Sequence, residues 1–261
     1  MCWHRFVVIR GLLAAFATTV PATAYSACDS RSGPQTAALV ELYTSEGCSS
    51  CPPADRQLSR LRQVLDPAAV AVPLALHVGY WDYIGWKDPY SQAVFGERQS
   101  WLVRANQQKV VYTPQYFVGG AELRSTQEGI REQVRRLNAL PPAAAIRLQA
   151  GLSASGAAAL SAEATTPVAS SAAVLYLAVT ESGLVSQVTR GENSGETLLH
   201  DHVVRAWIGP VRLAGGAARV QRNIELPAEW VRRRLGVIAF VQDERSGRVL
   251  QALQVQNCLG S

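Results

Sequence analysis

The chain has 261 residues, of which 48% are hydrophobic and 17% are charged, and its formal net charge is +5. This composition is that of a globular protein with a buried core, which excludes a disordered chain. The basic residues are scattered except for the run 232–234, which is typical of the solvated face of a short helix, so we expect no nucleic-acid partner.

The first residues are typical of a secretory signal. Arg5 and Arg10 supply positive charge, residues 11–20 are apolar and small, and an A-x-A cleavage pattern ends at Ala24. We therefore predict a signal peptide over residues 1–24 and a periplasmic or secreted protein. The apolar stretch is shorter than the ~20 residues that a membrane helix needs, and no later stretch qualifies, so we expect no membrane span.

Strands and helices alternate along the first half of the exported chain. Strands are predicted over residues 38–43, 70–78, 115–118 and 121–124, and helices over residues 52–65, 91–108 and from the capping-box pattern at 125–128 onward. The order is β-α-β-α-β-β-α. Such alternation predicts an α/β domain, to which we assign residues 36–140.

After the double proline at residues 141–142 the pattern changes to short strands separated by Gly, Ser and Asn clusters. Seven strands are predicted, over residues 145–150, 157–163, 173–180, 203–208, 219–224, 237–242 and 249–255. Strands of this length and spacing are typical of an antiparallel sandwich. We therefore expect an all-β sandwich domain over residues 143–258, with nothing in it that is catalytic.

The cysteines point to an oxidising compartment, where thiols form disulfides. Cys2 leaves with the signal peptide, and Cys48 and Cys51 form one candidate pair. Because chain termini often lie close in space, we predict a structural disulfide between Cys28 and Cys258. Four cysteines still allow three connectivities, and the sequence does not choose among them. Lipoprotein processing at Cys28 is disfavoured, since no aliphatic residue stands three positions before it.

Cys48 and Cys51 stand where the first predicted strand turns into the first predicted helix. Two thiols with this spacing can close a small disulfide ring, and the positive end of the helix dipole stabilises a thiolate on the first. We predict that Cys48 is the exposed, attacking sulfur and that Cys51 resolves the mixed disulfide. Structural zinc is the alternative, but it needs four ligands and the chain has no second such pair. We expect no metal and no cofactor.

Three features of the first half resemble the thioredoxin superfamily in its shorter, glutaredoxin-like arrangement. They are Glu41 in the first strand, the motif from Cys48 to Cys51, and Thr113 with Pro114 before the third strand. The resemblance implies a thioredoxin-like domain followed by the β-sandwich. It also implies a cis-proline at Pro114 packed against the disulfide, and Glu41 as the buried acid that takes the proton of Cys51.

The exported chain resembles more closely a family of secreted bacterial thioredoxin-like proteins catalogued as domain of unknown function 1223. The matching stretches are residues 40–55, 80–89, 97–99, 112–115, 191–195 and 203–205. This second resemblance implies a fold and no established substrate.

Aromatic residues follow the second predicted strand. Trp81, Tyr83 and Trp86 are predicted to form a substrate-binding lip beside the disulfide, and core packing is the alternative. Together the features predict a thiol-disulfide oxidoreductase that acts on protein or small thiols and has an unknown redox partner. Two alternatives use the same dithiol: a copper-handling protein that adds His77 as a ligand, and a non-catalytic binding module. Met1 is the sole methionine, which argues against copper.

Overall fold

The computed structural model describes residues 1, 28–124, 127–167 and 172–260. Apart from Met1, the predicted signal peptide lies outside the described residues. Within these ranges, none of the helices combines the length and the apolar character that a membrane span requires.

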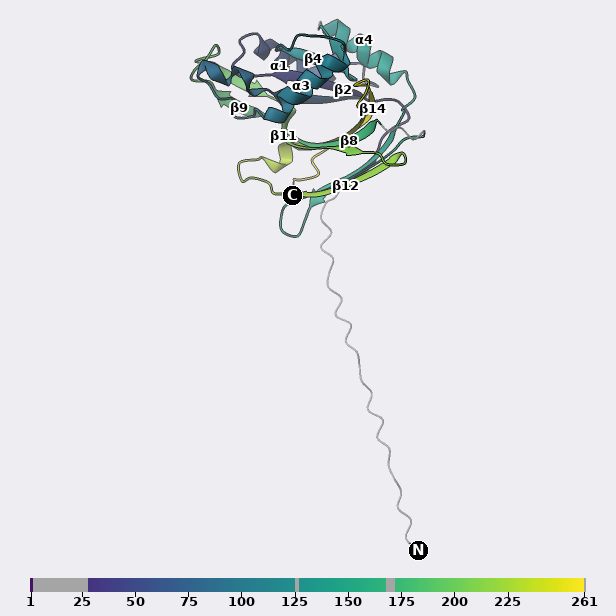
Figure 1. Cartoon of the computed structure of the whole chain (residues 1–261). Helices are drawn as coiled ribbons and strands as arrows, with labels where there is room; N and C mark the ends of the chain where they lie inside the picture. Colours follow the sequence, from purple (N-terminus) through teal and green to yellow (C-terminus); the bar gives the residue numbers. More distant parts are fainter. Residues whose placement is uncertain (2–27, 125–126, 168–171, 261) are drawn as a thin grey trace.

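One eight-stranded sheet runs through both halves of the chain, with the order β14-β13-β8-β11-β3-β2-β4-β5 (Figure 1). Its strands are β2 (Ala38–Thr44), β3 (Ala71–His77), β4 (Gln115–Val118), β5 (Ala121–Leu123), β8 (Ala173–Glu181), β11 (Val203–Arg212), β13 (Leu235–Asp243) and β14 (Val249–Gln256). The halves meet at β11, which pairs in parallel with β3 and antiparallel with β8.

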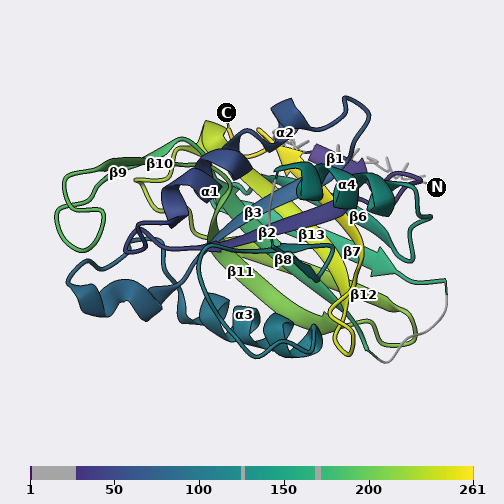
Figure 2. The ribbon, with the colours of Figure 1, turned by 90° about the horizontal axis from the view of Figure 1, so that it is seen from above.

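Helices cover the part of the sheet that the first half contributes. On one face lie α1 (Cys51–Ser59), α2 (Leu61–Val64) and α4 (Gln127–Asn138), and on the other lies α3 (Ala93–Ala105) (Figure 2). Leu58 of α1 and Val134 of α4 pack with Val40 and Leu42 of β2. Since side chains alternate along a strand, the odd-numbered residues of β2 face α3 instead.

The core around α3 is shared by both halves. Phe95 and Leu102 of α3 pack with Phe117 of β4 and also with Phe240 of β13. Arg98 of α3 donates from Nε to Glu41 of β2 over 2.7 Å and from Nη2 to Gln242 of β13 over 2.9 Å. A buried charge and a common apolar cluster therefore join strands from the two halves of the chain.

A second sheet packs on the outer face of β8, β13 and β14. It has the order β1-β6-β7-β12 and consists of β1 (Cys28–Arg31), β6 (Ala145–Leu152), β7 (Ala158–Thr165) and β12 (Ala217–Ile224). Cys28 at the start of β1 is joined by a disulfide to Cys258, just after β14, with a Cα–Cα distance of 5.5 Å. This bridge fastens the first described strand to the end of the chain.

The predicted fold class, a thioredoxin-like α/β domain followed by a separate β-sandwich, is wrong. Strands dominate the chain, and the sheet of the first half continues through β11 into three strands of the second. The alternation of strands and helices is present in the first half of the chain. The sequence pattern behind it depends only on how each element is buried. It carries no information on which strand lies beside β3. The limits 36–140 and 143–258 stay predictions.

The sequence pattern did not predict a small hairpin in the second half of the chain. β9 (Leu184–Gln187) and β10 (Thr197–His200) form a two-stranded sheet of their own, and β10 packs on α1. Val185 and Leu199 pair across it and are both exposed, so its strands lack the apolar pattern of a buried one. The loop of residues 188–196, which joins the two strands, lies at the amino end of α1.

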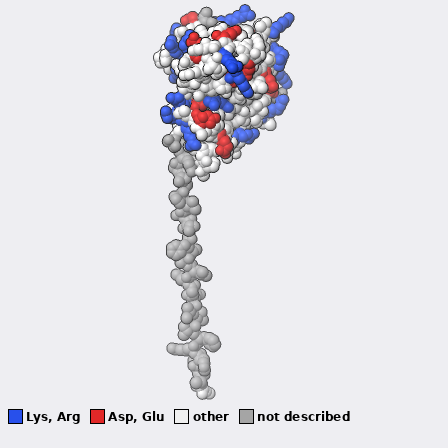
Figure 3. All heavy atoms as spheres, turned by 90° about the vertical axis from the view of Figure 1, so that its left-hand side faces the viewer, with Lys and Arg blue, Asp and Glu red and all other residues white. Residues whose placement is uncertain are grey.

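Charges of both signs are interspersed on the surface. Figure 3 shows Lys and Arg side chains spread over one face, with Asp and Glu between them. Some form exposed pairs, as Arg131 does with Asp66 at 3.5 Å. Exposed pairs of this kind contribute at most about 1 kcal/mol to stability.

Candidate redox site

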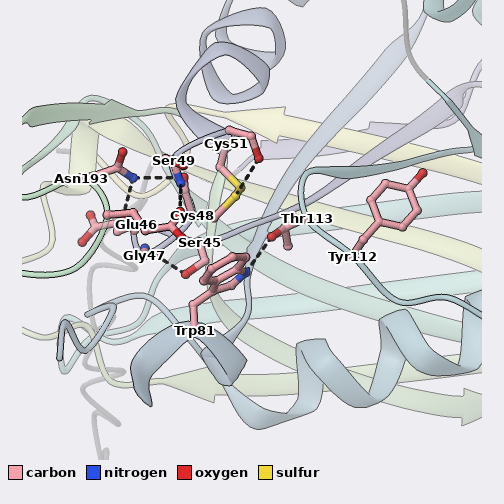
Figure 4. The surroundings of a disulfide bond; sticks show 12 residues. Ser45, Glu46, Gly47, Cys48, Ser49, Cys51, Trp81, Tyr112, Thr113 and Asn193 are labelled. Carbon is pink, nitrogen blue, oxygen red and sulfur yellow. Dashed lines mark hydrogen bonds between the residues drawn. A yellow bond between two sulfur atoms is a disulfide. The ribbon is translucent and has the colours of Figure 1, made fainter. Parts of the chain in front are cut away.

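A disulfide joins Cys48 and Cys51 at the amino end of α1 (Figure 4). The chain leaves β2 at Thr44, turns over residues 45–50, and enters α1 at Cys51. Pro52 in the first turn favours a helix start, because a proline lacks the N–H that would there be unpaired. The pair therefore lies where a strand end meets the positive end of a helix dipole.

Both sulfurs are covered in the oxidised protein. Cys48 is 1% exposed and Cys51 is 0% exposed, so the prediction of an exposed Cys48 is wrong for this state. Ser49 and Ser50 between them are exposed, and the Ser50 hydroxyl lies 3.3 Å from Cys48 Sγ. A reactant thus meets the serines first, and reaching the sulfur requires a surrounding segment to move.

Trp81 ties the turn to the loop that carries Pro114. It belongs to the 3₁₀ helix η1 (Gly79–Ile84), and its Cβ would lie 2.9 Å from a Cβ added to Gly47. Its indole Nε1 donates to the hydroxyl of Thr113 over 2.7 Å, and the Thr113-Pro114 peptide bond is cis. Figure 4 shows Trp81 and Thr113 on one side of the disulfide and Asn193 on the other.

The loop of residues 188–196 contacts the turn of residues 45–50 from the opposite side. Asn193, 6% exposed, donates from Nδ2 to the carbonyl oxygens of Glu46 and Cys48 over 2.8 and 3.0 Å. The Glu192 carboxylate accepts the backbone N–H of Ser49 over 2.9 Å. Ser49 lowers the pKa of Glu192 through its backbone N–H and its hydroxyl. The sequence predicted no functional residue in this half of the chain.

Glu46 braces the turn from within. It is fully buried, and its carboxylate lies 3.0 Å from His200 Nε2 and accepts the indole N–H of Trp86 over 2.8 Å. Its backbone N–H donates to Asp88 over 2.9 Å. Two segments that are distant in sequence, residues 86–88 and His200, thereby fix the residue two positions before Cys48.

A histidine and a carboxylate form a buried pair behind this turn. His77 Nδ1 lies 2.7 Å from Asp88 Oδ2, with both side chains excluded from solvent. Burial alone would lower the pKa of His77, but the neighbouring Asp88 carboxylate raises it above its ordinary value. Burial alone would raise the pKa of Asp88, and the His77 contact lowers it. The opposite shifts show that each group stabilises the charged form of the other.

Asp55 lies one helical turn beyond Cys51. The spacing of four residues places both side chains on one face of α1, toward the sheet. Asp55 is 8% exposed, and burial raises its pKa, with His77 and His200 acting in the opposite sense. Among the described residues, Asp55 Oδ1, His77 Nε2 and His200 Nδ1 have no hydrogen-bond partner. A buried acid with a raised pKa therefore lies on the same face of α1 as Cys51. The four-residue spacing is a signal that the sequence analysis missed.

Glu41, the predicted proton acceptor, lies on the other face of the sheet. Its carboxylate pairs with Arg98 and accepts the hydroxyl of Tyr43 over 3.2 Å. Even-numbered residues of β2 such as Leu42 pack toward α1, so Glu41 points toward α3. The structure does not bring Glu41 together with Cys51.

The three aromatic residues of the predicted lip have different environments. Trp81 and Trp86 are partly buried and hydrogen-bonded to the frame of the turn. Tyr83 is 83% exposed, so its side chain alone is freely available to a partner. In the part of the chain that the structure describes, His, Cys, Asp and Glu side chains form no group of three or more suited to a metal ion.

Fold and site together define a β-rich protein with a Cys-x-x-Cys disulfide at the amino end of a helix. The family model described as "Protein of unknown function (DUF1223)" matches residues 39–242. The chain belongs to this family. No curated protein matches the chain.

Two solved structures are similar in fold. A crystal structure of a protein from Agrobacterium tumefaciens is 24% identical, with a TM-score of 0.58, and the match covers 84% of this chain and 94% of that one. HBP35 of Porphyromonas gingivalis is 14% identical, with a TM-score of 0.69, and the match covers 86% and 76% of the two chains. At these identities the similarity concerns the fold alone.

Proposed function

We propose that this protein is a thiol-disulfide oxidoreductase that acts through Cys48 and Cys51. The observation that carries the proposal is the buried Asp55, with its raised pKa, one turn behind a disulfide at a helix amino end. A purely structural disulfide would not require a proton acceptor at this place. Burying such an acid costs stability, and perturbed acids of this kind cluster at functional sites.

The reaction moves two electrons and needs one internal proton acceptor. In the reduced protein, the Cys48 thiolate attacks a substrate disulfide, and one substrate sulfur leaves as a thiolate. Asp55 takes the proton of Cys51. The Cys51 thiolate then attacks the Cys48 sulfur, the protein disulfide closes, and the second substrate sulfur leaves as a thiolate. The substrate disulfide is reduced and the protein dithiol is oxidised.

The substrate class follows from what surrounds the pair. Ser49 and Ser50, between the two cysteines, and Glu192, which accepts the Ser49 N–H, are exposed while the sulfurs are covered, which suits a polypeptide that lies across the surface. We propose a protein thiol or disulfide as substrate and a separate redox partner that restores the pair. Two disulfides suit a periplasmic or secreted location.

Substitution of the attacking sulfur tests the proposal. Cys48→Ser is expected to reduce the rate of insulin reduction by dithiothreitol to the uncatalysed background, because no mixed disulfide can form on the serine. The assay follows the turbidity of precipitating insulin chains. The matched control is Cys28→Ser/Cys258→Ser, which removes the other disulfide and is expected to keep the wild-type rate while folded. Equal rates for wild type and Cys48→Ser would refute the proposal.

Replacing Asp55, the proposed proton acceptor, is expected to raise the stability of the protein and to lower its activity. A carboxyl whose pKa is higher in the folded than in the unfolded chain destabilises the fold once the pH exceeds the unfolded value, about 3.9 for Asp. Asp55→Asn should therefore raise the melting temperature at pH 8, with the gain shrinking as the pH falls toward 4. Insulin reduction should slow by roughly 10²-fold. The exposed Asp66→Asn should change neither quantity, and an Asp55→Asn variant of wild-type activity would remove Asp55 from the mechanism.

A further inference from the structure

The turn of residues 45–50, which carries Cys48, has few free backbone donors. Gly47 N–H donates to the Ser45 hydroxyl over 3.2 Å, and Cys48 N–H donates to the Ser45 carbonyl over 3.2 Å. Cys51 N–H donates to the Cys48 carbonyl over 3.1 Å, and the two prolines at residues 52–53 have no N–H. These bonds leave the N–H groups of Ser49 and Ser50 unused, so the Ser49 N–H is one of two donors beside the sulfur that could stabilise a thiolate on Cys48.

In the oxidised protein the Ser49 N–H is already bonded to Glu192. Its carboxylate accepts the Ser49 N–H over 2.9 Å, although α1 carries no acidic residue in its own first turn. The negative charge of Glu192 therefore belongs to a loop that is distant in sequence, and it lies next to the proposed attacking cysteine. In the oxidised protein this arrangement is favourable, because the disulfide is neutral and the helix end attracts an anion.

The position of Glu192 is fixed by its neighbours. Asn193 is anchored by its two hydrogen bonds to the turn. Gly191 has a φ of +77°, and a Cβ there would lie 3.1 Å from Ile84, so the loop approaches η1 closely at a glycine. A residue held on both sides in this way presents its carboxylate reproducibly.

We propose that Glu192 is a positioning residue that makes the Cys48–Cys51 pair harder to reduce, by holding a negative charge and the Ser49 N–H beside the sulfur. This inference deepens the proposed function and rests on it, since redox tuning matters only if the pair exchanges electrons. The function of the loop is then electrostatic as well as structural.

The relevant equilibrium is the exchange with glutathione. Two glutathione thiols are oxidised to one glutathione disulfide, the bond between the two protein sulfurs breaks, and two protons pass from glutathione to the protein sulfurs. Cys48 then releases its proton to solvent where its thiolate is favoured. Glu192 opposes that last step, because its charge repels the thiolate and competes for the same N–H.

The test compares Glu192→Gln with wild type in glutathione buffers at low ionic strength, with trapping of free thiols and mass analysis of the reduced fraction. The glutamine keeps the shape and loses the charge. We expect the equilibrium constant for reduction to rise roughly threefold to tenfold, tenfold being about 30 mV toward a less negative potential. Glu196→Gln, in the same loop, is the matched control and should leave the constant unchanged.

Salt distinguishes a charge effect from a disturbed loop. At 1 M salt the screening length falls to about 3 Å, so the difference between Glu192→Gln and wild type should shrink to less than about twofold. No difference at low salt, or a difference that persists at 1 M salt, would overturn the inference. A shift seen as expected in a protein that does not reduce insulin would instead leave the inference standing and remove the proposed activity.

Discussion

Replacement of Arg98 by methionine is expected to lower the free energy of unfolding by about 3–5 kcal/mol, because it leaves the Glu41 carboxylate buried without its partner. Arg98 and Glu41 are 4% and 0% exposed and lie 2.7 Å apart. Burial alone would lower the pKa of Arg98, and the Glu41 carboxylate raises it, so the Arg98 guanidinium is charged in the folded protein. Urea unfolding followed by tryptophan fluorescence measures the loss.

The same substitution removes contacts that join the two halves of the chain. The Arg98 guanidinium lies 5.0 Å from the ring centroids of Tyr176 and Trp207 and 5.1 Å from that of Phe240, all in the second half. The matched control is Arg131→Met, which breaks the exposed pair with Asp66 and should cost less than about 1 kcal/mol. A loss for Arg98→Met no larger than for this control would contradict the expectation.

Removal of the long disulfide has the second large expected effect. Cys28 and Cys258 are separated by 230 positions, so their bond restricts nearly the whole unfolded chain. Cys28→Ser/Cys258→Ser should lower the free energy of unfolding by up to about 5 kcal/mol, as the chain-entropy argument gives for very long loops. Denaturant unfolding without reducing agent compares the variant with wild type.

The second disulfide supplies the internal control for that experiment. Cys48 and Cys51 are three positions apart, so their bond closes a very small ring and restricts the unfolded chain much less. Cys48→Ser/Cys51→Ser should therefore shift the unfolding midpoint by less than the loss of the long bridge. Equal shifts for the two double variants would show that loop length does not govern stability here.

The elements of the fold that could be predicted are those whose burial is visible in their own pattern of apolar and polar residues. The alternating and apolar patterns of residues 38–43 and 115–118 predicted strands that are present as β2 and β4. The position of β11 beside β3 left no such trace, because Val203 and Ala75 pair through backbone groups common to every residue. The fold class was wrong for this reason, although most of its elements were expected.

The candidate site likewise combines residues marked by local motifs with residues that only the folded chain brings together. Cys48, Cys51 and Thr113 were singled out by their local motifs, and the spacing of Asp55 to Cys51 is a local signal too, although it was not used. Glu192 was not, since its contact with Ser49 exists only after the β9–β10 hairpin has folded onto α1. The burial of Cys48 was unforeseen because part of its cover comes from that hairpin.

The place of Cys258 sets the order of events when the chain is made. It is synthesised 230 positions after Cys28, whereas Cys48 and Cys51 are three positions apart and can pair with each other early. The long bridge cannot close until Cys258 has been synthesised. Correct biogenesis therefore requires either that the Cys28 thiol stays unreacted until then or that an isomerase undoes its premature pairings.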